Sequence, residues 1–260
     1  FVKSYYTHNM IKEEGKFKWL EEGEGHPIIL LHGLMGGVEN FGDMVTHISK
    51  EYKVYGLDLK LFKGRLLKVS VKKLSDYLYA FMQHIKVEHA VLIGNSMGGH
   101  IALIFTKEYP KKVDGIILTG SSGLFENSLG NSFPRRGDKE YIRKKTEEVF
   151  YDPKVATDEL VDKVYEIANN RMSVLKLLRY AKSAIRHNMA LDIPNITEPV
   201  CLIWGEEDKV TPPHVAREFD KLFPNSELHW IKLCGHAAMW EHPDKFSEIA
   251  LNWLQRHTKE

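Results

Sequence analysis

The sequence predicts an α/β fold in which a mostly parallel β-sheet is covered by helices on both faces. Short apolar runs alternate with stretches of helical periodicity through most of the 260 residues, which is the pattern of strand-helix-strand units. Glycines and polar residues follow several of these runs, at the place where the carboxyl ends of parallel strands form binding sites. We therefore expect the functional residues at one edge of the sheet.

Each element has its own local signal. An antiparallel hairpin is expected where a stretch ending near Ile11 meets the apolar run at Phe17 through Glu14-Gly15. Helices are expected where apolar residues recur at helical spacing, and proline at the first turn supports two of the starts. The expected strands are 17–20, 28–31, 54–57, 90–93, 113–118, 200–204 and 227–231, and the expected helices are 40–51, 71–85, 97–109, 212–223 and 243–255.

The alternation stops between residues 124 and 191. This region contains no convincing strand and three successive helical segments, near 139–150, 158–169 and 173–188. We therefore predict a core formed by 1–123 and 192–260, with 124–191 inserted into it. Most apolar side chains of the insertion should pack it against itself and the sheet, while a few line a pocket; the candidates are Phe125, Phe133, Phe150, Tyr151, Tyr165, Met172 and Met189.

Composition excludes several classes of protein. The 36 Lys and Arg residues nearly balance 35 Asp and Glu residues, and the resulting charge of +1 gives no global field for nucleic acid or an anionic membrane. No stretch approaches the roughly 20 apolar residues of a membrane helix. The two cysteines, Cys201 and Cys234, lie in apolar surroundings and indicate buried thiols in a reduced cytoplasmic protein. A leader removed before Phe1 stays an open alternative.

Ser96 is the candidate nucleophile. The sequence Gly94-Asn95-Ser96-Met97-Gly98 has the form G-x-S-x-G, and it lies between an apolar run and a helix. A sharp strand-to-helix turn would expose the serine hydroxyl in a strained backbone conformation and would tolerate only small neighbours. The helix amino terminus would supply a free amide and a positive dipole where an oxyanion forms.

Candidates for the base and the orienting acid lie downstream. A serine hydroxyl reacts at neutral pH only with a base in hydrogen-bond reach and an acid that orients the base. His236 follows the predicted strand 227–231, and Asp208 follows the predicted strand 200–204. Because residues just past parallel strands meet at one edge, Ser96, Asp208 and His236 should converge. Glu206 and Glu207 stay open as alternative acids.

The glycine-rich loop after strand 28–31 should complete an oxyanion hole. His32-Gly33-Leu34-Met35-Gly36-Gly37 offers free backbone amides, and we expect the donors to be the amides of Leu34 and Met97. His32 should support the loop rather than react. The loop lacks the spacing of a phosphate-binding motif, and the sequence contains no His-Glu-x-x-His or zinc-knuckle pattern. Neither a metal nor a cofactor is expected.

Taken together, the His-Gly loop, the G-x-S-x-G turn and the order Ser, Asp, His resemble the α/β-hydrolase superfamily. The resemblance covers nearly the whole chain. It implies the fold of that superfamily, with 124–191 as a helical cap inserted after the sixth core strand and placed over the active site.

A closer resemblance is to the meta-cleavage product hydrolases, which split carbon-carbon bonds. Shared strings are Gly94–Gly99, Gly120–Leu124, Phe150–Asp152 and Cys234–His242, and Asn40 matches an asparagine of those enzymes. The chain departs from them in having Ala237 where they carry tryptophan after the catalytic histidine. It also has Lys163-Val164 where they carry an arginine that binds the substrate carboxylate, leaving Lys163 or Arg171 as substitutes.

These departures rank ester hydrolysis first and carbon-carbon cleavage second. The expected substrate is a small to medium, largely apolar carbonyl compound, bound by a subset of loop, cap and strand-end residues. A ligand sensor without catalysis is the alternative class, because this fold alone does not fix function. The only partners expected are the substrate and, as an option, a second copy of the chain; the candidate substrate-binding residues are Gly33, Asn40, Phe125, Phe150 and Trp240.

Overall fold

The central element is an eight-stranded, mostly parallel sheet. The computed structural model describes residues 10–64, 66, 69–125 and 135–258, and in this part the strands have the order β1-β2-β4-β3-β5-β6-β7-β8. The pairs β1/β2 and β2/β4 are antiparallel, and the remaining pairs are parallel. The strands are β1 (Ile11–Glu14), β2 (Phe17–Glu22), β3 (Pro27–Leu31), β4 (Lys53–Leu57), β5 (Ala90–Asn95), β6 (Val113–Thr119), β7 (Val200–Gly205) and β8 (Ser226–Ile231).

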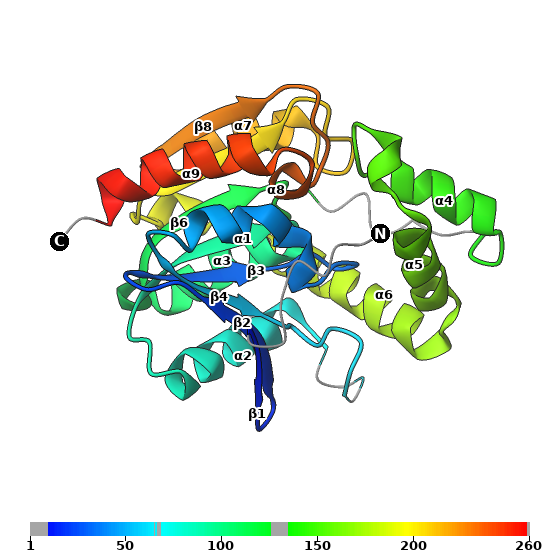
Figure 1. Cartoon of the computed structure of the whole chain (residues 1–260), viewed down its shortest axis with the longest axis horizontal. Helices are drawn as coiled ribbons and strands as arrows, with labels where there is room; N and C mark the ends of the chain where they lie inside the picture. Colours follow the sequence, from blue (N-terminus) through cyan, green and yellow to red (C-terminus); the bar gives the residue numbers. More distant parts are fainter. Residues whose placement is uncertain (1–9, 65, 67–68, 126–134, 259–260) are drawn as a thin grey trace.

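Helices cover both faces of this sheet (Figure 1). On one face, α1 (Gly42–Ile48), α8 (Ala238–Glu241) and α9 (Pro243–His257) contact one another, and α9 packs on β6, β7 and β8. The opposite face carries α2 (Val71–His84), α3 (Met97–Glu108) and α7 (Pro213–Leu222). The predicted α/β fold class is therefore confirmed.

The alternation of side chains along each central strand divides the core into two layers. In β5, Leu92 packs with the α2, α3 and α7 side, while Val91 and Ile93 pack with the α1, α8 and α9 side. All three side chains are fully buried. A strand covered on both faces is apolar at successive positions, which is why the central strands were recognisable as continuous apolar runs.

The helices between β6 and β7 lie together at one end of the molecule (Figure 1). They are α4 (Lys139–Glu147), α5 (Asp158–Asn169) and α6 (Arg171–Arg186). The helix expected over 139–150 ends at Glu147, so residues 148–150 leave the helix and pass close to the histidine loop. The predicted division into core and cap stays a prediction, and Phe133 lies outside the described residues.

Two further expectations concern single segments. The helix expected over 40–51 is a 3₁₀ turn, Val38–Phe41, followed by the short helix α1. Cys201 and Cys234 are buried and free, as predicted. Among the helices in the described ranges, none combines the length and apolarity that crossing a bilayer requires.

Candidate active site

Ser96 lies at the sharp turn between β5 and α3. Its backbone has φ 54° and ψ −119°. Residues other than glycine rarely adopt a conformation with positive φ, and it costs on the order of 1–3 kcal/mol. The turn is held from both sides, because the Ser96 amide donates to the Thr119 carbonyl at 3.1 Å and the Ser122 amide donates to the Ser96 carbonyl at 3.1 Å. The surrounding sheet therefore maintains the strained turn.

Close packing explains the glycines at either side of Ser96. A Cβ atom at position 98 would collide with the carbonyl oxygen of Leu31, and one at position 94 would collide with the backbone of Gly99. The helix α3 can approach β3 and β5 only because these side chains are missing. The spacing G-x-S-x-G is thus a requirement of the turn rather than of the reaction.

Asp208 is held in a fixed orientation by the turn that follows β7. Its side chain is buried, and Oδ1 accepts hydrogen bonds from the amides of Val210 at 2.8 Å and Thr211 at 2.9 Å. The hydroxyl of Thr211 donates to Oδ2 at 2.8 Å. The Trp204 indole in turn donates to the Thr211 carbonyl at 2.9 Å, so the whole turn is anchored to β7.

Oδ2 of Asp208 also contacts His236. The distance to Nδ1 of the imidazole is 2.9 Å, and both side chains are nearly inaccessible to solvent. With Nδ1–H donating to the carboxylate, Nε2 is left as an acceptor. The two alternative acids have other positions: Glu207 Oε2 accepts from the Cys234 amide at 2.9 Å, and Glu206 is exposed.

Hydrogen bonds from β5 and from the segment after α4 position the loop that carries His236. The Asn95 amide group donates to the carbonyl of His236 at 3.2 Å and to that of Thr119 at 3.1 Å. The backbone amide of His236 donates to the Val149 carbonyl at 2.8 Å. The histidine loop is therefore tied both to β5 and to the segment after α4.

The glycine-rich loop after β3 lies against Ser96. A Cβ at Gly33 would be 3.2 Å from the Ser96 Cβ, so the loop can come this close because residue 33 has no side chain. His32 supports the loop: Nδ1 donates to the Gly33 carbonyl at 2.9 Å, and Nε2 accepts from the Leu59 amide at 3.1 Å. Burial lowers the pKa of His32, which keeps the imidazole neutral.

Two backbone amides near Ser96 are available as oxyanion donors. Met97 is the first residue of α3, and the first amides of a helix have no acceptor within the helix. Leu34 follows Gly33 on the facing loop and lines the same pocket as Ser96. The assignment of these amides to an oxyanion hole stays a prediction.

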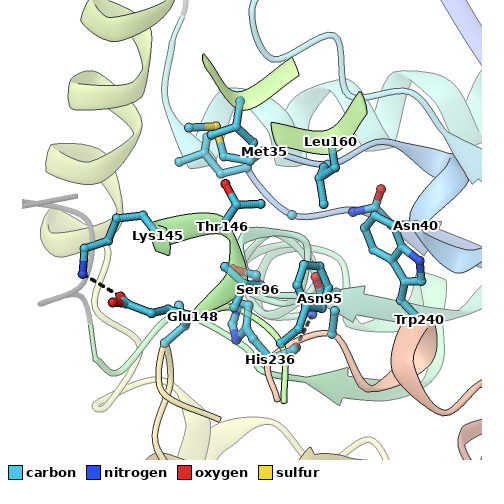
Figure 2. Close-up of a pocket in the computed structure, with 18 of the residues that line it drawn as sticks. Met35, Asn40, Asn95, Ser96, Lys145, Thr146, Glu148, Leu160, His236 and Trp240 are labelled. Atoms are coloured by element: carbon cyan, nitrogen blue, oxygen red, sulfur yellow. Dashed lines mark hydrogen bonds and ion pairs between the residues drawn. The ribbon is translucent and has the colours of Figure 1, made fainter. Parts of the chain in front are cut away.

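Ser96 and His236 form the floor of a cavity of about 430 Å³ (Figure 2). Asn40 and Trp240 lie on one side of it, and Lys145 and Glu148 lie on the other. Of the predicted substrate-binding residues, Gly33, Asn40, Phe150 and Trp240 line the cavity. Phe150 and Trp240 contact each other edge to face, with ring centroids 5.4 Å apart.

Phe125 is not among the residues that line this cavity. Its ring packs edge to face on His214, with centroids 5.5 Å apart. An apolar side chain after β6 can cover either the core or the pocket, and here the helix α7 offers the contact. The structure therefore gives no support to the predicted contact of Phe125 with substrate.

The helices between β6 and β7 form the opposite wall of the cavity. Lys145 and Thr146 of α4, Leu160 and Val164 of α5, and Leu177 of α6 line it. Of the two substitutes proposed for a carboxylate-binding arginine, Lys163 forms an ion pair of 2.6 Å with Glu39 and Arg171 is exposed. In the described part of the chain, neither these two nor any arginine contributes to the cavity wall; its cations are Lys145 and Lys209.

Several contributors to this site carried no sequence signal of their own. The Thr211 hydroxyl donates to Asp208 and lies 3.2 Å from His236 Nδ1. In the sequence, only the position of Thr211 shortly after Asp208 could have suggested these contacts. Lys209 lines the cavity because it adjoins Asp208. Glu241 accepts from the amides of Gly235 and Tyr151, both at 2.7 Å, and only the fold reveals that contact.

Comparison with known proteins bears on the family of the chain. A family model described as alpha/beta hydrolase fold matches residues 26–243. A 2-hydroxy-6-oxononadienedioate/2-hydroxy-6-oxononatrienedioate hydrolase from Pseudomonas sp is 28% identical over 91% of this chain and 90% of its own length. A 2-hydroxy-6-oxo-6-(2'-aminophenyl)hexa-2,4-dienoic acid hydrolase from Metapseudomonas resinovorans is 28% identical over 98% and 93%.

A solved structure is more similar in sequence. It is MGS-MChE2, an alpha/beta hydrolase enzyme from the metagenome of sediments of the Mar Chica lagoon in Morocco. The two chains are 42% identical and superpose with a TM-score of 0.80. The match covers 96% of this chain and 99% of the other. The relationship thus extends over nearly the whole of both chains.

Proposed function

The chain belongs to the alpha/beta hydrolase fold family and is a hydrolase enzyme, and from this premise we propose that Ser96, His236 and Asp208 form its catalytic triad. The contact of 2.9 Å between His236 and a buried Asp208, beside a cavity that Ser96 also lines, carries the proposal. A buried carboxylate that orients an imidazole next to an activated serine is the arrangement that nucleophilic catalysis requires.

The reaction begins with attack of Ser96 Oγ on a substrate carbonyl carbon. His236 Nε2 removes the hydroxyl proton, and Asp208 stabilises the imidazolium that forms. The amides of Leu34 and Met97 donate to the oxyanion. The tetrahedral intermediate then expels the leaving group, which takes the proton from His236, and water hydrolyses the acyl-enzyme by the same steps.

For the bond that is cleaved, we propose a carbon-carbon bond next to a ketone. The named relatives that support this choice act, by their names, on 2-hydroxy-6-oxo dienoates. This reverses the order expected from the sequence, in which ester hydrolysis came first. The cavity supports the choice as well, because an apolar wall that includes Phe150 and Trp240 suits a conjugated carbon chain.

The chemistry of such a compound fits a serine nucleophile. Transfer of the 2-hydroxyl proton to C5 gives a 2-oxo compound with an isolated ketone at C6, to which Ser96 Oγ adds. The C5–C6 bond then breaks, and its electron pair is delocalised onto the 2-oxo oxygen as a dienolate, which takes the proton from His236. Water releases the remaining acyl group as a carboxylic acid.

Carboxylic ester hydrolysis is the second candidate, and one observation favours it. A dienoate carries a carboxylate, and bidentate recognition of that group is best performed by arginine. In the described part of the chain, the cavity wall contains no arginine, and Lys145 is paired with Glu148 at 2.6 Å. Lys209 is the cation that remains for the carboxylate of a dienoate.

Parallel assays with two substrate classes test the proposal. We expect the purified enzyme to remove the visible absorbance of 2-hydroxy-6-oxo-6-(2'-aminophenyl)hexa-2,4-dienoate with a kcat/KM at least about tenfold above that for p-nitrophenyl butyrate. The opposite ratio would establish the ester hydrolase. Turnover of neither compound would overturn both substrate proposals.

A serine variant tests the triad itself. Ser96→Ala should abolish turnover of whichever substrate the wild type uses, while its thermal unfolding stays close to that of the wild type. Ser49→Ala is the matched control, because Ser49 caps the carboxyl end of α1, before β4, and does not line the cavity. Retained activity in Ser96→Ala would end the nucleophile assignment.

A further inference from the structure

A second cluster of polar side chains lies at the opposite edge of the sheet from Ser96. His26 directly precedes β3, His89 directly precedes β5, and Asp114 is the second residue of β6. These three strands are neighbours in the sheet and run parallel. Their amino ends therefore bring together two imidazoles and a carboxylate that are far apart in the sequence.

The two imidazoles converge on one carboxylate oxygen. His89 Nδ1 lies 2.6 Å and His26 Nε2 lies 3.0 Å from Oδ2 of Asp114, and the ring centroids are 5.8 Å apart. His26 Nε2 is buried, yet it makes no hydrogen bond of acceptable geometry in the described part of the chain. His26 Nε2 thus faces the Asp114 carboxylate without the alignment of a hydrogen bond. This arrangement suits two groups that act as ligands of the same metal ion.

A break in the strand register places the carboxylate there. Ala90 pairs with Val113, but Val91 pairs with Gly115, so Asp114 is an extra residue between two regular pairs. Such bulges redirect a side chain away from the alternation of the strand. Ile28 pairs with Val91, and His26 and His89 each lie two residues before this pair, so the two histidines are level with each other. The bulge brings Asp114 next to both of them.

We propose that His26, His89 and Asp114 bind a divalent transition metal ion of the zinc type. The ligands are Nε2 of His26, Nδ1 of His89 and a carboxylate oxygen of Asp114, with water completing a tetrahedral set. Two imidazoles and one carboxylate suit Zn²⁺, whereas Ca²⁺ and Mg²⁺ prefer oxygen ligands throughout. All potential ligand atoms lie within 4.8 Å of one another, so small side-chain movements give the usual bond lengths near 2.0–2.2 Å.

The place of the site in the fold indicates binding and stabilisation rather than catalysis. His89 and Ser96 flank the two ends of β5, which separates them by roughly 20 Å at about 3.3 Å per residue. The ion would join the starts of three central strands, and binding to the folded chain alone stabilises it. The His89 side chain is 52% exposed, which gives the ion a route from solvent.

Titration of the full chain with Zn²⁺ tests the proposal. After treatment with EDTA and its removal, calorimetry should show one equivalent bound at about 0.1 mM Zn²⁺ or below, and the thermal midpoint should rise. Co²⁺ in place of Zn²⁺ should give visible absorption bands of a tetrahedral complex. His89→Gln and Asp114→Asn should each bind at least about tenfold more weakly, since loss even of an outer partner costs about 10- to 100-fold.

A matched control removes a histidine from a pair that offers only two ligands. His47 Nε2 lies 2.9 Å from Asp244, and His47→Gln should bind Zn²⁺ as the wild type does. His89, Asp114 and His47 are at least partly exposed, so we expect their variants to fold. Circular dichroism checks this before titration. Absence of binding in the wild type, unchanged affinity in His89→Gln, or a loss confined to one of the two site variants would each overturn the three-ligand site.

Discussion

Glu241 joins the histidine loop to the segment after α4, through its contact with Tyr151. Oε2 of Glu241 accepts a hydrogen bond from the Tyr151 amide at 2.7 Å, and Oε1 accepts one from the Gly235 amide at 2.7 Å. Burial raises the pKa of Glu241, although the amide donors act against this shift. One carboxylate thus fixes the backbone of the histidine loop and of the segment after α4.

We therefore predict that Glu241→Gln lowers both stability and turnover. An amide offers one acceptor oxygen, so one of the two backbone N–H groups would face an NH₂ group. The loss should be about 1–3 kcal/mol in the free energy of unfolding, with a fall in kcat because the His236 loop becomes less fixed. Urea unfolding and steady-state kinetics measure the two effects. An unchanged kcat would show that the contact is structural only.

Asp208→Asn should lower kcat by about 10⁴-fold with little change in fold, as in a chymotrypsin-type triad. An asparagine amide cannot hold the tautomer that leaves His236 Nε2 free to accept a proton. Glu207→Gln is the matched control on the same turn, since Glu207 accepts from the Cys234 amide instead of contacting His236. If Glu207→Gln shows the large loss, the assignment of the acid is wrong.

The triad candidates show how far sequence alone can reach. Ser96 follows a strand that is buried throughout, and His236 follows a predicted strand and a glycine, so local pattern was sufficient to single them out. The choice among Glu206, Glu207 and Asp208 needed the structure, because three adjacent carboxylates are chemically alike. Only the turn after β7 determines that Asp208 faces the imidazole.

The contacts of Glu241 and Phe125 could not be assigned in advance. Glu241 and Tyr151 are 90 positions apart, and no local pattern links them. Phe125 was expected in the pocket but packs on His214, because an aromatic side chain gains from burial in either place. The continuous apolar strands, by contrast, are recognisable locally, since burial on both faces requires them to be apolar.

Lys209 provides a test of substrate charge. If the substrate carries a carboxylate, Lys209→Met should raise the KM for the dienoate by about 10- to 100-fold, since a charge-assisted hydrogen bond contributes about 1.5–3 kcal/mol. The KM for neutral p-nitrophenyl butyrate should stay the same. Lys163→Met is the control, because Lys163 pairs with Glu39 and does not line the cavity. Equal effects on both substrates would exclude Lys209 from carboxylate recognition.

The burial of His100 should make the free energy of unfolding depend on pH. It is buried in α3, where Nε2 donates to the carbonyl of His187 at 2.8 Å, and burial lowers its pKa to about 4. In the unfolded chain a histidine titrates near 6.5. Between these values the unfolded chain binds a proton that the folded chain does not, so the free energy of unfolding falls as pH falls from about 6.5 to about 4.

The loss at this residue should be on the order of 3 kcal/mol and complete below about pH 4. His100→Gln keeps a donor for the His187 carbonyl but does not titrate, so its stability should decline less steeply over the same range. Urea unfolding of both proteins at several pH values measures the two slopes. Above pH 7.5 the curves should run parallel, since His100 is then neutral in both states. Equal slopes below pH 6.5 would contradict the assignment of this acid sensitivity to His100.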